Sequence, residues 1–473
     1  MFKLSDLLEA VTGKCPEQAS LVIPEAAIDS RQVIPGSMFV ALPGEKVDGH
    51  DFVKSAFERG ASLALIQHDP KETLPTLDLS KSKLPEPLVI PSTPFCVKVK
   101  DSLKAMQETA RIVRNHSNVK VIGITGSVGK STTKEVITEV LAQRYHTLKN
   151  PGNLNNEIGL PLTLLKLGLG HERAVLEMGF YVPGEISFLC ELAKPEIGVV
   201  TNIGTVHAGR AGSLEAIARG KAELVKALPA APRGVAILNR DDPWVTRMAE
   251  QTKARVLFYG LDPQADVWAD EIVSLGLEGI TFQLHYKNET LHMKVPLIGR
   301  HSVHTALRAI SVGLAESLTW QEIVGGLTSG QPQLRLVAVH TSSGALILDD
   351  TYNASPESTL AALNLLDDLG GRKIAVLGDM LELGQYERRG HELVGSRAAE
   401  IVDSLVTLGE RGRIIADAAL QAGLPKSLVM SFDTTDQVVV YLKKILQPED
   451  VALIKGSHSM RMDRIVTALE VNS

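Results

Sequence analysis

Val121-Ile-Gly-Ile-Thr-Gly-Ser-Val-Gly-Lys130-Ser131-Thr-Thr-Lys-Glu135 is the stretch that decides the fold. Its apolar beginning predicts a buried parallel strand, which ends in a glycine-rich turn. A helix is expected to open at Ser131, with an apolar inner face made by Val136, Ile137, Val140 and Leu141. Glycines let backbone N–H groups approach an anion, and the helix N-terminus adds its positive end. The stretch therefore predicts a phosphate-binding loop.

The chemistry of this loop follows from its two central side chains. Lys130 is expected to reach the β- and γ-phosphates of a nucleotide, and the Ser131 hydroxyl to bind Mg²⁺. The spacing departs from the general P-loop, because the position five residues before Gly129 is Ile124 and the first glycine is Gly126. The alternative is a strand-to-helix turn that binds nothing. Lysine and serine directly after the glycine favour the phosphate loop over that alternative.

The composition is that of an ordinary globular protein. The chain has 473 residues, of which 44% are hydrophobic and 22% charged, so two to four domains are expected. A net charge of −6 without a basic tract gives no support to a nucleic-acid partner. Three scattered cysteines suit a reducing compartment, and neither a signal peptide nor an apolar span is recognisable. We expect a cytoplasmic protein.

The pattern of elements predicts an α/β protein of three domains, at residues 1–98, 99–330 and 331–473. The first is a small α/β module whose polar turns, Asp29-Ser-Arg and Asp48-Gly-His, are by residue type more often surface loops than sites. In the second, strand-like segments alternate with helical ones, which is typical of a doubly wound parallel sheet. They lie at residues 174–177, 197–201, 234–238 and 255–258. The third repeats the α/β pattern as a Rossmann-like domain.

Polar residues follow two of the central strands. Glu177 ends one strand and His207 comes shortly after another. Ligands of such sheets bind beyond the carboxyl ends of the strands, so both side chains can face a cation beside Ser131. An isolated Glu or His at a strand end is usually a polar loop residue. Two that converge on a phosphate loop make a Mg²⁺ site plausible.

A lysine interrupts the apolar face of the helix predicted after Ser213. Lys221 falls on the same stripe as Ile217 and Leu224, so the spacing points it inward. The alternative is a lysine that extends its ammonium to the surface along the helix. Spacing alone does not decide between these two interpretations.

The motifs together resemble one family. The compact loop from Thr125 to Ser131 is similar to the ATP loop of the Mur ligase and folylpolyglutamate synthetase superfamily. Further Mur ligase motifs follow in order along the chain: Asp29-Ser-Arg, Asp48-Gly-His-Asp-Phe, Gly152-Asn-Leu-Asn-Asn, Glu177-Met-Gly, Thr201-Asn-Ile-Gly-Thr-Val-His, Asp349-Asp-Thr-Tyr-Asn and Leu377-Gly-Asp-Met-Leu-Glu-Leu-Gly. The last two, with Asn153-Leu-Asn-Asn, favour a dipeptide-adding Mur ligase over one that adds diaminopimelate or lysine.

The resemblance implies an ATP-dependent amide-bond ligase of peptidoglycan precursor synthesis. Three domains, for a UDP-sugar, for ATP and for the incoming amine, would close over one site. The substrates would be UDP-N-acetylmuramoyl-tripeptide and D-alanyl-D-alanine, and the cofactors ATP and Mg²⁺. ATP would convert the peptide carboxylate to an acyl phosphate, which the dipeptide amine then attacks. We expect a monomer with neither a nucleic-acid nor a membrane partner.

The resemblance also implies roles for single residues. ATP would be bound by the loop and by three distant residues: Gly126, Ser127, Val128, Gly129, Lys130, Ser131, Thr132, His301, Arg335 and Asp350. The metal would be held by Ser131, Glu177, His207 and Lys221, the lysine as a carbamate. Lys130, Glu177, His207 and Lys221 would be catalytic. The substrates would contact Ser30, Arg31, Asn153, Asn155, Tyr352 and Asn353.

Two departures from the family pattern leave alternatives open. His301-Ser-Val-His304 stands where asparagines are usual, and His458 stands where arginine is common. A non-catalytic relative would be favoured if these changes abolished turnover. A folylpolyglutamate synthetase would lack the N-terminal Asp29-Ser-Arg module, and a simple ATPase switch would not need three domains.

Overall fold

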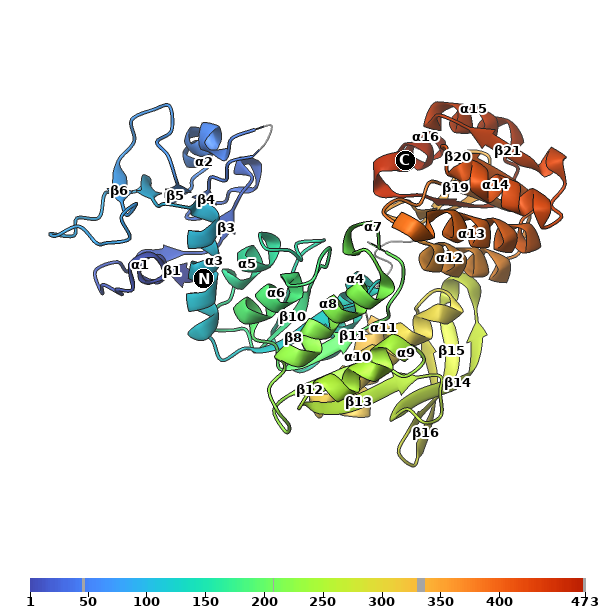
Figure 1. Ribbon diagram of the computed structural model, residues 1–473, viewed down its shortest axis with the longest axis horizontal. Coiled ribbons are helices and arrows are strands. Elements are labelled where there is room, and N and C mark those ends of the chain that lie inside the picture. Colours follow the sequence, from blue (N-terminus) through green and yellow to red (C-terminus); the bar gives the residue numbers. More distant parts are fainter. Residues whose placement is uncertain (45–46, 207, 330–336, 471–473) are drawn as a thin grey trace. The chain divides into compact units, whose positions relative to one another are not determined.

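The computed structural model describes residues 1–44, 47–206, 208–329 and 337–470, and it confirms the α/β class (Figure 1). The chain divides into two compact units. The first comprises residues 1–123, 145–179 and 185–196, and the second comprises residues 124–144, 180–184 and 197–473. The predicted domain boundaries near residues 98 and 330 stay predictions.

The first unit begins with a five-stranded sheet in the order β3-β4-β5-β7-β6, in which every neighbouring pair is parallel. Its strands are β3 (Ala26–Ala27), β4 (Met38–Val40), β5 (Leu63–Ile66), β6 (Thr76–Asp78) and β7 (Phe95–Lys98). A second, antiparallel pair and two helices accompany it: β1 (Phe2–Lys3), β2 (Val22–Ile23), α1 (Leu4–Thr12) and α2 (Val53–Glu58). The proline-rich stretch of low periodicity at residues 81–94 predicts a long loop or a domain edge, and this described segment contains neither helix nor strand.

The rest of the first unit leads into the phosphate loop. The sequence predicts a helix from about Ser102 to Asn115, and the structure confirms it as α3 (Ser102–Asn115), capped by the Asp101 carboxylate. Parallel β9 (Thr147–Lys149) and β10 (Arg173–Glu177) follow, together with α5 (Gly159–Leu164) and α6 (Glu185–Ala193). Strand β8 (Lys120–Thr125) is divided between the units, because its first four residues belong to the first and Ile124 and Thr125 to the second.

The second unit continues with six strands in the order β16-β15-β14-β13-β12-β11. From β11 to β14 the pairs are parallel, and β14, β15 and β16 are antiparallel. The backbone N–H of Thr201 donates to the Thr125 carbonyl at 2.9 Å, so the end of β8 lies beside β11. The bounds are β11 (Ile197–Val200), β12 (Val235–Asn239), β13 (Arg255–Gly260), β14 (Val267–Ser274), β15 (Ile280–Tyr286) and β16 (Glu289–Val295). The alternation of apolar and polar residues at 280–297 predicts a β-hairpin, which β15 and β16 confirm.

Helices bring distant parts of this unit to the phosphate loop. Helix α4 (Lys130–Ala142) starts one residue before the predicted Ser131 and packs against α10 (Val303–Ala315) and α11 (Trp320–Ser329). The approach to α11 is close, because a Cβ on Gly326 would lie 2.3 Å from the Val140 Cα. The other helices here are α7 (Ala208–Ala211), α8 (Leu214–Ala227) and α9 (Pro243–Thr246).

The C-terminal part of the second unit is a six-stranded sheet in the order β17-β18-β22-β19-β20-β21. Only β17 is antiparallel to its neighbour. The strands are β17 (Val337–His340), β18 (Leu346–Asp350), β19 (Lys373–Gly378), β20 (Ser404–Leu408), β21 (Val429–Phe432) and β22 (Val451–Lys455). Separate apolar cores lie against α12 (Pro356–Asp368), α13 (Glu387–Ile401) and α14 (Gly412–Gln421), and against α15 (Thr435–Ile445) and α16 (Asp463–Leu469).

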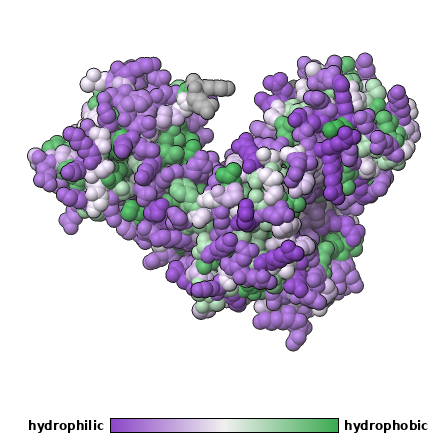
Figure 2. All heavy atoms as spheres, viewed as in Figure 1, coloured by the Kyte–Doolittle hydropathy of each residue, from purple (hydrophilic) through white to green (hydrophobic). Residues whose placement is uncertain are grey.

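The face of the molecule drawn in Figure 2 is mostly hydrophilic. Figure 2 shows polar side chains over most of the face in view, with hydrophobic ones scattered among them. Among the described residues, no helix combines the length and the apolar character that crossing a bilayer requires.

Candidate active site

The loop between β8 and α4 needs glycine at two positions. Gly126 has φ +145°, and a Cβ there would lie 1.8 Å from the Thr201 Oγ1. Gly129 caps α4 in the left-handed conformation with φ +82°. Side chains other than glycine are strained at such angles, and the first position has no space for one. The compact spacing that begins at Gly126 is therefore a steric requirement of this loop.

The segment after β11 braces the loop. The Thr201 Oγ1 donates to the Val128 carbonyl at 2.7 Å, and the Asn202 Oδ1 accepts from the Val128 N–H at 2.9 Å. The Ser127 N–H donates to the Asn202 carbonyl at 2.9 Å, and the Ser127 Oγ accepts from the Gly204 N–H at 2.8 Å. These bonds fix the backbone of the loop in one shape, as pre-organised phosphate binding requires.

Two lysines meet at one carbonyl oxygen of the loop. The Lys130 Nζ donates to the Gly126 carbonyl at 2.8 Å, and the Lys221 Nζ donates to the same oxygen at 2.9 Å. Lys221 is only 1% exposed, and its ammonium lies 4.8 Å from the centre of the Phe180 ring. The inward interpretation of Lys221 is therefore confirmed, and the surface interpretation is wrong. Helix α8, capped by Ser213 as predicted, places this lysine against the loop.

Glu177 and Asn155 lie together in the first unit. Glu177 ends β10, is 1% exposed, and accepts a hydrogen bond from the Asn155 Nδ2 at its Oε1, at 2.8 Å. The backbone of Glu177 is held on both sides by the amide of Asn150. The carboxylate is thus buried and held in one orientation by its neighbours. Asn153 lies in the same loop, where its carbonyl accepts from the Asn155 N–H at 2.7 Å.

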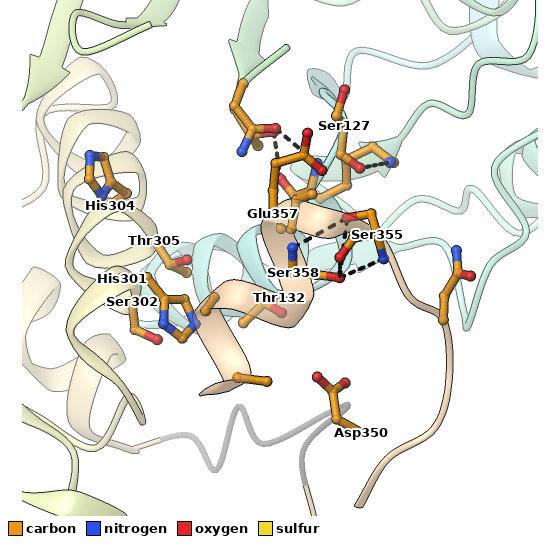
Figure 3. A pocket seen from close by; sticks show the side chains of 18 of the residues that line it. Ser127, Thr132, His301, Ser302, His304, Thr305, Asp350, Ser355, Glu357 and Ser358 are labelled. Atoms are coloured by element: carbon orange, nitrogen blue, oxygen red, sulfur yellow. Dashed lines mark hydrogen bonds between the residues drawn. The ribbon is translucent and has the colours of Figure 1, made fainter. Parts of the chain in front are cut away.

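A pocket of about 390 Å³ opens beside the loop within the second unit (Figure 3). Figure 3 shows His301 just before α10, Thr305 near the start of that helix, Ser127 and Thr132 from the loop and α4, and Asp350 from β18 around the pocket. The structure brings nine predicted residues to its lining: Ser127, Val128, Gly129, Lys130, Thr132, His301, Asp350, Tyr352 and Asn353. Ser131 is buried in the first turn of α4.

The two histidines of the His301-Ser-Val-His304 stretch have different surroundings. Surrounding protein lowers the pKa of His301, and the positive charges of His304 and Arg308 lower it further. His304 instead pairs with Asp241, whose Oδ2 lies 2.7 Å from the His304 Nε2. Burial alone would raise the pKa of Asp241, but His304 and the backbone N–H groups it accepts from hold it below its ordinary value. His301 thus offers the pocket a neutral ring at pH 7.

The C-terminal wall of the pocket carries a buried ion pair. The Lys455 Nζ lies 2.6 Å from the Asp350 Oδ2 and also donates to the Asn353 carbonyl at 2.8 Å. Lys455 is 2% exposed and ends β22, and Asp350 ends β18, so the pair joins the ends of two neighbouring strands. The rings of Tyr352 and His458 are 6.1 Å apart, which places the second departure next to a predicted substrate residue.

The remaining predicted residues lie elsewhere. Ser30 is buried in the first unit, and the exposed Arg31 forms a two-pronged ion pair with Asp29. His207 and Arg335 lie outside the described residues, so their predicted roles stay predictions.

Three family models match the chain. They are described as "Mur ligase family, catalytic domain" over residues 23–114, "Mur ligase middle domain" over residues 124–313 and "Mur ligase, glutamate ligase domain" over residues 334–458. A relative from Synechocystis, named UDP-N-acetylmuramoyl-tripeptide--D-alanyl-D-alanine ligase, is 36% identical over 93% of this chain and 90% of its own. One of the same name from Bacillus subtilis is 35% identical over 98% of both chains.

The chain belongs to the Mur ligase family.

Solved structures of other Mur ligases share this fold. The crystal structure of MurF from Acinetobacter baumannii is 29% identical and superposes with a TM-score of 0.82 over 99% of both chains. MurF ligase from Thermotoga maritima, in complex with ADP, is 26% identical with a TM-score of 0.76 over 95% of this chain and 97% of its own. The predicted three-domain α/β class of this Mur ligase is confirmed.

Three residues of this Mur ligase site were not among the candidates from sequence. Asn202 braces the loop, Arg308 lines the pocket, and Glu357 accepts from the Thr205 N–H and hydroxyl at 3.1 Å. Asn202 lies in the motif Thr201-Asn-Ile-Gly-Thr-Val-His, directly after a strand, and this position could have identified it as a site residue. Arg308 lies in the middle of an apolar helix face, and its position beside Gly129 follows only from the packing of α10 against α4.

Proposed function

We propose that this chain is an ATP-dependent ligase that joins D-alanyl-D-alanine to the peptide carboxylate of UDP-N-acetylmuramoyl-tripeptide. The observation that carries the proposal is the braced phosphate loop, whose residues line the pocket that also contains the start of α10 and the end of β18. The names of the relatives and the ADP complex of a related ligase support the substrates and the nucleotide.

The chemistry requires activation of a carboxylate. A carboxylate oxygen takes the γ-phosphoryl group of ATP, and ADP leaves. The dipeptide amine then attacks the carbonyl carbon, a C–N bond forms, and the C–O bond to phosphate breaks. The first transfer depends on positioning and on charge neutralisation. In this chain Lys130 supplies the charge, and the fixed N–H groups of the loop supply the position.

The proposed metal residues fit Mg²⁺ by the chemistry of their donor atoms. Ser131 offers a hydroxyl oxygen, and Glu177 offers a buried carboxylate that Asn155 orients. Such hard oxygen ligands are those that Mg²⁺ prefers. Lys221 joins the set as a carbamate, and His207 completes it. When bound, Mg²⁺ would supply positive charge to the phosphates.

The other residues have roles in nucleotide and substrate binding. ATP contacts the loop from Gly126 to Thr132, then His301, Asp350 and Arg335. The UDP-sugar contacts Ser30 and Arg31, and the peptide and incoming dipeptide contact the remaining four, Asn153, Asn155, Tyr352 and Asn353. His301, Asp350, Tyr352 and Asn353 line one pocket, which supports a nucleotide site and a substrate site that adjoin.

We also propose a cytoplasmic monomer that uses neither nucleic acid nor membrane as a partner, with three domains at residues 1–98, 99–330 and 331–473. All three cysteines are free, which suits a reducing compartment. The oligomeric state can be measured by light scattering coupled to gel filtration, where a dimer would refute the monomer.

The test is phosphate release by the purified protein. Release should require ATP, UDP-N-acetylmuramoyl-tripeptide and D-alanyl-D-alanine together, and mass spectrometry should show the UDP-pentapeptide product. L-alanyl-L-alanine is the matched control and should give no product. Release that depends instead on a folate and glutamate would refute the proposal.

The folylpolyglutamate synthetase alternative has weaker support. The Mycobacterium tuberculosis enzyme in complex with ADP and AMPPCP is 15% identical over 78% of this chain, with a TM-score of 0.61. A likeness of this degree shows a shared fold alone. Arguments for function therefore rest on the ligases that match at higher identity along nearly the whole chain.

A further inference from the structure

Arg308 is a buried cation at the wall of the nucleotide pocket. It lies on α10, is 5% exposed, and is among the residues that line the pocket. Its guanidinium faces the glycine that caps α4, because a Cβ built on Gly129 would lie 3.4 Å from its Nη2 and 3.7 Å from its Nη1. The charge is therefore at the phosphate loop, although the residue follows that loop by almost 180 positions.

The partners of this guanidinium are few and uncharged. Its Nη2 donates to the Thr305 Oγ1 at 2.7 Å, and its Nε has no hydrogen-bond partner within the described parts of the chain. The Tyr259 ring centre lies 5.8 Å away. Among the residues that the structure describes, no carboxylate forms an ion pair with Arg308.

The described lining of the pocket contains two acids, Asp350 and Glu357, and each has contacts of its own. The Asp350 carboxylate pairs with Lys455 at 2.6 Å, and the Glu357 Oε1 accepts from Thr205. Neither forms an ion pair with Arg308, although the Glu357 Oε2 is buried without a hydrogen-bond partner in the described structure. The guanidinium thus has no paired carboxylate among the described residues of this wall.

Burying such a charge destabilises the free protein. A buried ion without a paired counter-ion is costly, and burial lowers the pKa of Arg308 from its ordinary value. The N-terminus of α4, a helix of 13 residues, adds partial positive charge at the same place, and Lys130 adds a full one. An anion bound here would offset all three.

We propose that Arg308 provides a fixed positive charge that binds the phosphates of the nucleotide beside Gly129. This inference rests on the proposed function only for the presence of a nucleotide in this pocket. Arg308 contributes to affinity through charge, so its effect grows with the number of phosphates on the ligand. Adenosine, which carries none, gains nothing from it.

The test compares nucleotides by isothermal titration calorimetry on the full chain. Arg308→Met removes the charge and keeps most of the volume. It should weaken ATP and ADP roughly 10- to 100-fold, the range expected for one lost charged hydrogen bond. Adenosine should change by less than about threefold. An equal loss for adenosine and ATP, or no loss for ATP, would overturn the proposal.

A second measurement separates this role from a structural one. Without nucleotide, Arg308→Met should unfold at the same or a higher temperature than the parent, because an uncompensated buried charge is gone. A lower unfolding temperature with an unchanged ratio of ATP to adenosine affinity would show a purely structural arginine. Arg308→Lys keeps the charge, so its ratio of ATP to adenosine affinity should stay within about fivefold of that of the parent protein. A ratio as low as that of Arg308→Met would contradict the charge argument.

Arg114→Met is the matched control. Arg114 is equally buried, at 6% exposed, but donates to the backbone carbonyls of Ala193 and Ser117 and does not line the pocket. Arg114→Met should lower the unfolding temperature and leave the ratio of ATP to adenosine affinity unchanged. The binding assay involves no ligation, so Arg308 can fail this test while phosphate release succeeds, and the reverse.

Discussion

Replacing Gly126 with alanine should disable the phosphate loop through one steric conflict. The new Cβ would lie 1.8 Å from the Thr201 Oγ1 and 2.9 Å from the Thr201 Cβ, so the side chain of Thr201 must move. Its hydrogen bond to the Val128 carbonyl is then lost, which costs about 1 kcal/mol. A φ of +145° lies outside the small left-handed region, and such strain costs a non-glycine residue about 2–3 kcal/mol. We expect a total of about 3–4 kcal/mol.

The substitution should also displace Lys130 and Lys221, because the ammonium groups of both lysines donate to the Gly126 carbonyl. Thermal unfolding with and without ATP measures this effect, because the transition that ATP shifts to higher temperature is that of the part of the chain that binds ATP. Gly126→Ala should lower that transition and abolish the shift by ATP.

Gly152→Ala is the control for backbone strain alone. Gly152 also has a positive φ, +53°, but a Cβ there meets nothing within 4 Å. This variant should lose only about 1 kcal/mol and keep ATP binding. Adding Thr201→Ala to Gly126→Ala should return part of the lost stability, because the 1.8 Å contact disappears. If Gly126→Ala is as stable as Gly152→Ala and binds ATP normally, the steric argument is wrong.

Three further predictions concern charged or titrating side chains. Lys130→Met should lower the rate of phosphate release by orders of magnitude, because charge on the transferred phosphoryl group is no longer neutralised. The unfolding temperature should stay unchanged. A variant that keeps most of its activity would refute the proposed role of Lys130. Lys221→Ala should be nearly inactive and recover with an added short carboxylic acid if Lys221 acts as a carbamate; normal activity without the acid would contradict it. Burial lowers the pKa of His50 from 6.5, although its bond to Asp48 opposes this, and the His50 Nε2 accepts the Gln67 N–H. The unfolded chain therefore binds a proton that the folded one does not, and stability is lost as pH falls below about 6.5. His50→Gln should reduce the slope of urea stability between pH 7 and pH 5, and a parent curve without slope would count against this account.

The sequence by itself determined the elements that depend on local pattern. The strand, turn and helix of the phosphate loop follow from an apolar run, two glycines and a helix-forming segment, and all three are in the structure. Helix α3 has the predicted bounds, because a capping aspartate opens it and an apolar stripe runs through it. The inward direction of Lys221 was likewise contained in helical spacing. These features need only neighbours within a few turns of chain.

The tertiary structure decided which residues meet across long separations. Thr201 and Gly126 are far apart in sequence, and only the pairing of β8 with β11 shows that the glycine is required by the threonine hydroxyl. Arg308 occupies an apolar helix face, where spacing predicts a core residue. Only the packing of α10 against α4 brings its charge to Gly129. Hydrophobic periodicity specifies which face of an element is buried, but the partner of that face is set by the free energy of the whole packed core.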